Sequence, residues 1–195
     1  VSLTPKSARR KLRQIRKDNS SYLIQHSEIL DRLEGENPAA ASQCRYLWQQ
    51  DGDPVYRNTA VQYYPQATDA FTAMKEALEQ AESFIFMEYF IVSEGKVWND
   101  ILEVLTQKVQ EGVEVKLIFD DFGTLRINTH AFRKEMKNRG IEMCIFNPIH
   151  QDVLRMMFNY RNHKKITVID GNIAYTGGSN LADAYANYIV RVGHW

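Results

Sequence analysis

The residues best suited to chemistry lie between His163 and Asn180, in the stretch HKKITVIDGNIAYTGGSN. A histidine, a lysine two residues later and an aspartate five residues after that precede Gly-Gly-Ser-Asn. An imidazole beside an ammonium group, with glycine N–H groups and an asparagine amide nearby, is suited to bind a phosphate. A histidine in such a site can attack phosphorus as a nucleophile. The alternative for an isolated His-x-Lys pair is a surface strand whose two side chains merely face water.

The run 164–170 is rich in β-branched residues and is followed by a glycine, which predicts a strand. Side chains alternate between the two faces of a strand. His163 and Lys165 are therefore expected on one face, and Ile166 and Val168 on the other, directed into a core.

The residues after this strand predict a hairpin. Gly171-Asn172 suits a tight turn before a second short strand at 173–176. The glycine pair 177–178 is then expected to bring bare backbone beside the face that carries the histidine and the lysine.

The full spacing, His-x-Lys-x4-Asp-x6-Gly-Gly-x-Asn, resembles the catalytic motif of the phospholipase D superfamily. The flanking sequences RNHKKI at 161–166 and TGGSNLAD at 176–183 resemble the first catalytic half of a bacterial cardiolipin synthase. The alternation of helical and strand patterns along the chain independently predicts an α/β fold. Together they predict a phospholipase D-like α/β sandwich, with a mixed central sheet flanked by helices and a basic helix before it.

The resemblance implies a two-step phosphoryl transfer. One histidine forms a phosphohistidine, and a second, from another copy of the motif, protonates the departing alcohol and then activates the acceptor. His163 is expected to be the nucleophile. Lys165 and Asn180 are expected to bind the phosphate oxygens, with Gly178 and Ser179 beside them.

Three carboxylates accompany this site. Asp170 completes the catalytic motif, but it lies at a turn and on the opposite strand parity from His163, so we expect it mainly to make structural hydrogen bonds. Glu88 interrupts the apolar run 83–92 and needs a partner. It could form a structural ion pair, but we favour a place in the floor of the active site, hydrogen-bonded to a catalytic group. The family also uses a later carboxylate to orient the histidine, for which Asp183 is the one candidate seen here.

For the intact protein, the resemblance implies phosphatidyl transfer between two phosphatidylglycerol molecules, giving cardiolipin and glycerol at the cytoplasmic face of the bacterial cell membrane. The second histidine would come from a second catalytic half of the same chain or from a second copy. No cofactor or metal is expected, because lysines and backbone donors offset the phosphate charge, and no nucleic-acid partner is expected. The alternatives are a homodimeric phosphodiesterase, nuclease or phospholipase D with one motif per chain, and a non-catalytic membrane-associated domain.

The composition sets limits on these hypotheses. The 195 residues are 44% hydrophobic, enough for one globular domain and an additional segment, and the formal net charge of zero gives no global attraction to nucleic acid. The two cysteines fit a reducing compartment and provide no disulfide framework. No apolar run spans a bilayer and no signal peptide is visible. Because the chain runs from Val1 to Trp195 without an initial methionine, we expect a soluble fragment of a longer protein.

The predicted domains are a basic helical linker over 1–42 and a first catalytic domain over 43–195, truncated at its C-terminus. A thin apolar stripe predicts a helix over 4–33. Seven basic residues precede Asp18, the first acidic one: Lys6, Arg9, Arg10, Lys11, Arg13, Arg16 and Lys17. They could be a solvated helix face or a juxtamembrane segment at an anionic leaflet. The resemblance favours the second, because these synthases carry membrane segments upstream.

Periodicity and capping residues predict the remaining elements. The expected helices are 68–81, 97–111, 129–139 and a short one at 181–186, and the expected strands are 83–92, 113–120, 141–146 and 188–195, with short extended segments in 55–64. The Asp120-Asp121 pair is assigned to a charged loop in preference to a metal site. The connector 149–160 contains Met156, Met157 and Phe158, which could pack beneath it or line an entrance for acyl chains.

Overall fold

The computed structural model describes residues 6–149 and 161–190. It divides the chain into two compact units, Val1–Gln62 and Tyr63–Trp195. The division falls after residue 62, whereas the sequence pattern places a boundary between residues 42 and 43. The difference arises because a helix that includes residue 43 belongs to the first unit.

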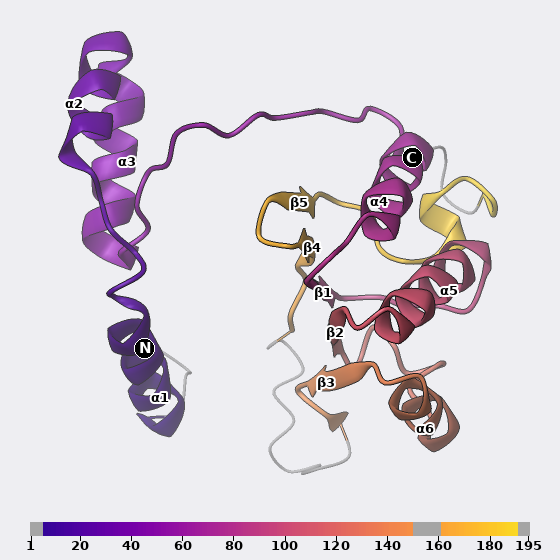
Figure 1. The fold of residues 1–195 in the computed structure, drawn as a ribbon. Coiled ribbons are helices and arrows are strands. Elements are labelled where there is room, and N and C mark those ends of the chain that lie inside the picture. Colours follow the sequence, from indigo (N-terminus) through magenta and orange to yellow (C-terminus); the bar gives the residue numbers. More distant parts are fainter. Residues whose placement is uncertain (1–5, 150–160, 191–195) are drawn as a thin grey trace. The chain divides into compact units, whose positions relative to one another are not determined.

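The first unit contains α1 (Lys6–Asn19), α2 (Ser27–Glu36) and α3 (Pro38–Asp51) (Figure 1). The single helix predicted over 4–33 is wrong, because a polar turn after Asn19 separates α1 from α2. The sequence pattern also missed α3, although its start and end carry recognisable signals. The side chain of Asn37 caps it by accepting a hydrogen bond from the N–H of Ala40 at 3.1 Å, and Gly52 ends it in the left-handed conformation.

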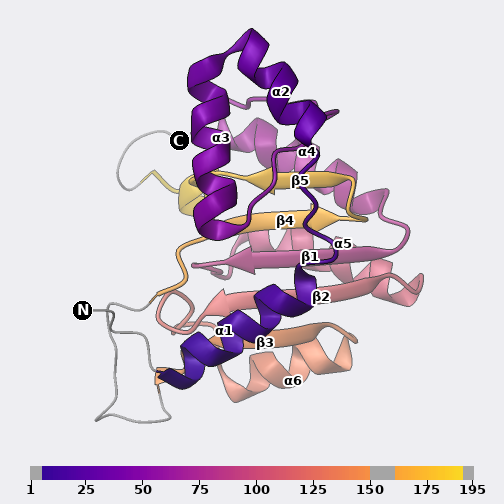
Figure 2. The same ribbon diagram turned by 90° about the vertical axis from the view of Figure 1, so that its left-hand side faces the viewer.

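The second unit is built on a five-stranded sheet with the order β3-β2-β1-β4-β5 (Figure 2). β1, β2 and β3 are parallel, whereas β4 runs antiparallel to β1, and β5 runs antiparallel to β4. The mixed sheet of the predicted α/β class is confirmed, and so is the hairpin formed by the last two strands. The strands are β1 (Phe84–Tyr89), β2 (Glu114–Asp120), β3 (Glu142–Phe146), β4 (Lys165–Ile169) and β5 (Ile173–Thr176).

The helices of this unit, α4 (Ala67–Glu79), α5 (Lys96–Gln110) and α6 (His130–Asn138), lie on one face of the sheet (Figure 1). Their apolar sides and the facing strand residues form the core, in which Trp98 and Phe119 are almost fully buried. The second face is less covered, since Phe86 and Ile118 are 37% and 38% exposed. β1 lies in the middle of the sheet, and no described helix of this unit covers its second face, although the apolar run 83–92 is typical of a strand buried on both sides.

The two faces of β4 are also assigned differently from the prediction. Lys165, Thr167 and Ile169 are buried on the helix-covered face, whereas Ile166 and Val168 are only half-buried. The expectation that Ile166 and Val168 enter the core is wrong, because the polar residues take the covered side. The buried hydroxyl of Thr167 is satisfied by that of Tyr89 at 2.9 Å. Burial raises the pKa of Tyr89 to about 12, so that hydroxyl stays protonated.

Asp170 closes the turn between β4 and β5, in the left-handed conformation with φ of 53°. Its carboxylate accepts three backbone hydrogen bonds from the start of β1: from Glu82 at 2.9 Å, and from Ser83 and Phe84 at 2.8 Å each. These hydrogen bonds lower the pKa of Asp170. Asp170 therefore joins the hairpin to β1, in agreement with the structural role expected for it.

Some predicted features fall outside the described residues, and others have a different secondary structure from the one predicted. Residues 150–160, which include Met156, Met157 and Phe158, and residues 191–195 lie outside the described residues. The described parts of 55–64 and 188–190 contain no strand, whereas a short 3-10 helix at Asp183–Tyr185 stands in the predicted helix 181–186. None of the described helices combines the length and hydrophobicity needed to cross a bilayer.

We predict that Asp170→Asn lowers the urea midpoint of unfolding at neutral pH, because an amide nitrogen would face one of the three backbone donors. Asparagine tolerates the left-handed turn, so the change isolates the hydrogen bonds. Because the folded pKa of Asp170 lies below its unfolded value, this stabilisation is fully present above the unfolded pKa and is lost as pH falls through the folded pKa. The two proteins should converge in acid, and a difference that is independent of pH would contradict this account.

Candidate active site

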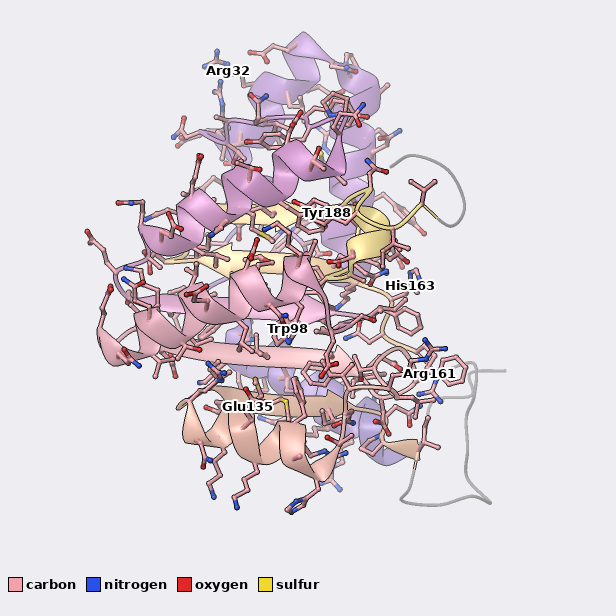
Figure 3. The ribbon with its side chains drawn as sticks, turned by 90° about the vertical axis from the view of Figure 1, so that its right-hand side faces the viewer. Arg32, Trp98, Glu135, Arg161, His163 and Tyr188 are labelled. Atoms are coloured by element: carbon pink, nitrogen blue, oxygen red, sulfur yellow. The ribbon has the colours of Figure 1, made fainter. Side chains whose placement is uncertain are left out.

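The register of the sheet brings the predicted site residues to one end. Tyr89, the last residue of β1, pairs with Lys165, the first residue of β4. Thr176 at the end of β5 pairs with Ile166. The residues that precede β4 and those that follow β1 and β5 therefore meet at the same edge. Figure 3 shows His163 and Arg161 together at this end of the sheet.

His163 and Lys165 form the centre of the site. The Nζ of Lys165 lies 2.9 Å from Nδ1 of His163 and also donates to its carbonyl oxygen at 2.7 Å. The ring of Phe90 lies 4.6 Å from the imidazole and 5.3 Å from the Lys165 amine, measured to the ring centroid. The lysine is only 5% exposed, whereas the histidine is exposed. Burial lowers the pKa of Lys165, because removal from water disfavours the charged amine.

Asn180 lies beside the residues that follow β1. Its Oδ1 accepts a hydrogen bond from the N–H of Ile91 at 2.9 Å, and the backbone of Leu181 bonds to Ile91 and Ser93. The side chain is 1% exposed, and its Nδ2 has no hydrogen-bond partner among the described residues. A buried donor without a partner is costly. The arrangement is therefore suited to an external acceptor, such as a phosphate oxygen.

The glycines before Asn180 leave open space. A Cβ atom placed on Gly177 or Gly178 would meet no other atom within 4 Å, and both residues are exposed. No described atom therefore occupies the space where a side chain at either position would lie. Ser179 is half-buried. Both glycines follow directly from the end of β5 that pairs near Lys165, so the open space lies on the site's edge of the sheet.

The segment that leads into His163 is held by Asp120, a contribution that the sequence did not reveal. Asp120 is fully buried at the end of β2. One carboxylate oxygen accepts from the N–H of Asn162 at 2.9 Å, and the other from the N–H of Phe122 at 2.9 Å and from Arg161 at 3.3 Å. The position of an aspartate at the carboxyl end of a parallel strand was the one available indication.

Glu88 contacts the two residues that flank His163 in the sequence. It accepts a hydrogen bond from the side-chain amide of Asn162 and lies 3.7 Å from the Nζ of Lys164. The predicted hydrogen bond to a catalytic group is therefore replaced by bonds to the two neighbours of His163. Glu88 is a positioning residue in this arrangement.

Asp170 and Asp183 lie away from the catalytic pair. Asp170 follows β4 at the end opposite Lys165, so it does not join the site with the other two residues of the predicted catalytic motif. Asp183 accepts hydrogen bonds from the N–H groups of Lys96 at 3.0 Å and Val97 at 2.9 Å, which caps α5. Asp183, the one candidate in the sequence for orienting His163, is therefore engaged with α5 instead.

Asp121, the first residue after β2, holds the loop that follows the strand. Asp121 accepts hydrogen bonds from the side chain of Asn128 and from the N–H of Ile149 at 2.7 Å. Within residues 6–149 and 161–190, no group of three His, Cys, Asp or Glu side chains is arranged to hold a metal ion. Asp121 therefore tethers the loop, whereas Asp120 belongs to β2 and not to the loop predicted for the pair.

Comparison of the sequence with known proteins identifies the family to which the chain belongs. The sequence profile described as "Cardiolipin synthase, PLD-like domain" matches residues 74–188, more than half of the chain. The chain is therefore a member of the phospholipase D superfamily. Within the superfamily it belongs to the family of cardiolipin synthase, PLD-like domains.

The chain is similar to several individual proteins. An uncharacterized protein of Streptococcus mutans is 44% identical over 89% of this chain, which covers 38% of that protein. A cardiolipin synthase of Alkalihalophilus pseudofirmus is 31% identical over 94% of this chain and 34% of its own length. The chain thus spans about a third of these relatives. A solved phospholipase D family member, Nuc of Salmonella typhimurium, has 21% identity and a TM-score of 0.45, with 62% of this chain and 70% of that one covered.

We predict that Asp183→Ala lowers stability by about 1 kcal/mol, the usual cost of a lost N-terminal cap, because two N–H groups of α5 lose their acceptor. Urea unfolding followed by circular dichroism measures this change. Asp100→Ala is the matched control, since Asp100 lies on the same helix and its ion pair with Lys96 is solvent-exposed. Equal losses in the two variants would contradict the capping role.

Proposed function

We propose that this chain is the first catalytic half of a cardiolipin synthase, which transfers a phosphatidyl group between two phosphatidylglycerol molecules. The observation that supports this most directly is the pairing of the buried amine of Lys165 with the exposed imidazole of His163. Asn180, which is bonded to the segment after β1, adds an Nδ2 donor that has no partner among the described residues. Together these groups provide one nucleophile and two donors for a phosphodiester. The similarity to cardiolipin synthases favours a lipid substrate.

In the proposed first step, Nε2 of His163 attacks the phosphorus of phosphatidylglycerol. A nitrogen–phosphorus bond forms as the bond to the glycerol oxygen breaks, and the departing glycerol takes a proton from a second histidine. In the second step, a hydroxyl of another phosphatidylglycerol loses its proton to that histidine and attacks the phosphohistidine. Cardiolipin forms and His163 is regenerated. Lys165 and Asn180 bind the non-bridging oxygens, where negative charge accumulates.

The hydrogen bond between Lys165 and Nδ1 of His163 bears on this mechanism. A lysine that donates to Nδ1 leaves the ring proton on Nε2, the nitrogen that must attack. In the proposed cycle, Lys165 turns to the substrate phosphate and a carboxylate accepts the proton on Nδ1. Glu88 bonds to Asn162 and Asp183 caps α5, so neither is placed for this task. We therefore propose that the orienting carboxylate lies outside these 195 residues in the intact protein.

The basic helix α1 fits a role at a membrane. Arg10, Lys11, Arg13 and Lys17 are exposed on it. Each basic residue near an anionic leaflet contributes about 1 kcal/mol of attraction. We place the intact protein at the cytoplasmic face of the membrane, where phosphatidylglycerol is itself anionic.

We predict that His163→Ala in the full-length protein lowers cardiolipin formation by about four orders of magnitude or more, as removal of a catalytic nucleophile does. Thin-layer chromatography of products from phosphatidylglycerol vesicles measures the yield. His130→Ala is the control, because His130 is an exposed histidine on α6, a helix that contributes no residue to the proposed site. A normal yield from His163→Ala would refute the proposed nucleophile.

We also expect residues 1–195 alone to form almost no cardiolipin, because one imidazole cannot both attack phosphorus and protonate the departing alcohol on the opposite side. Size-exclusion chromatography with light scattering, followed by the same assay, tests this. Full turnover by a monomer would contradict the two-half mechanism. Turnover by a dimer alone, with hydrolysis of simple phosphodiesters or DNA, would support the homodimeric alternative.

A further inference from the structure

A groove of about 370 Å³ lies next to the catalytic pair, at the carboxyl ends of β1 and β2. Such ends are where open α/β sheets bind ligands, and the volume is within the usual range for small-molecule sites. The wall formed by the segment after β1 contributes Val92 and Ser93. The loop after β2 contributes Phe122, Leu125, Arg126 and Ile127.

The groove and the site share one piece of backbone. Gly123, in the loop after β2, packs so closely on Phe90 that a Cβ atom there would lie 1.9 Å from the carbonyl oxygen of Phe90. The ring of the same Phe90 contacts His163. On the other side, the guanidinium of Arg161 lies 5.1 Å from the centroid of Phe122. The groove loop is therefore in contact, through Phe90 and Arg161, with the residues around His163.

Hydrogen bonds within the loop after β2 fix the conformation of the side of the groove that this loop forms. The Thr124 hydroxyl donates to the carbonyl oxygen of Asp120 at 2.7 Å, and the N–H of Asn128 donates to the carbonyl oxygen of Thr124 at 2.8 Å. These anchoring groups point inward, whereas Phe122 and Leu125 are 50% and 49% exposed on the outside. A fixed loop thus presents two apolar side chains around one groove, with the exposed Arg126 on its lining.

We propose that this groove binds an acyl chain of the phosphatidyl group whose phosphate lies at His163 and Lys165. Phe122 and Leu125 would cover the chain, and Arg126 would face the ester oxygens. The proposal rests on the proposed function, since it needs a phospholipid in the site. It adds a determinant of substrate choice, because a phosphodiester without acyl chains gains nothing from the groove.

Isothermal titration of the 195-residue chain with two ligands tests this. Dihexanoyl-phosphatidylglycerol, used below its micelle-forming concentration, carries acyl chains, and glycerophosphoglycerol is the same headgroup without them. Burying a few methylene groups should make the first ligand bind about tenfold more tightly than the second. Leu125→Gln should reduce this preference to about twofold and leave glycerophosphoglycerol binding unchanged. Ile173→Gln is the matched control, since Ile173 is 45% exposed at the far end of the β4–β5 hairpin.

The outcomes separate the two proposals. Lys165→Met should weaken both ligands, because it removes the phosphate donor. Equal affinity of the unsubstituted chain for both ligands, an unchanged preference in Leu125→Gln, or an equal loss in Ile173→Gln would overturn the groove while the phosphate site stands. Binding of neither ligand, or binding insensitive to Lys165→Met, would overturn the phosphate site and the groove with it.

Discussion

Asp120 is fully buried at the end of β2, and its carboxylate accepts hydrogen bonds from the backbone of Asn162 and Phe122 and from the side chain of Arg161. A buried carboxylate costs several kcal/mol unless donors surround it, and here three do. Two of them, on Arg161 and Asn162, belong to the segment that enters His163, and the third, on Phe122, belongs to the loop that forms the groove. A single charge thus fixes the spacing between the proposed nucleophile and the proposed acyl site.

Alternate residues in the range 162–165 make two different sets of contacts. Asn162 and Lys164 interact with Glu88, whereas His163 and Lys165 interact with each other and with Phe90. One set holds the backbone, and the other carries the proposed nucleophile and phosphate donor. The histidine is exposed because it precedes β4 at the end of the sheet, whereas Lys165 lies within β4 on the helix-covered face. Burial there disfavours the charged form of the lysine amine.

The motif, the hairpin and the parallel strands could be predicted because each depends on local signals: β-branched runs, turn glycines and helix caps such as Thr129, whose side chain accepts from the N–H of Phe132. The faces of β4 could not. A rule that places Ile166 and Val168 inside fails where a functional lysine and a threonine with a buried hydroxyl partner take the covered side. Asp183 was equally hidden, because its partners in α5 lie 86 and 87 residues earlier in the chain. The family was recognisable from the spacing alone, but the task of each carboxylate depended on tertiary contacts.

The pairing of β4 with β1 has a consequence for how the protein acquires its shape. β1, β2 and β3 are joined by α5 and α6 in sequence order, so they can associate through short-range contacts while the chain is being synthesised. β4 must return past both of them to lie beside β1, with Glu88 opposite Ile166. Closing so long a loop carries a larger entropic cost and slows folding. His163 and Lys165 are therefore expected to reach Phe90 and the end of β1 only after β1, β2 and β3 have paired, so that the proposed phosphate site is completed late in folding.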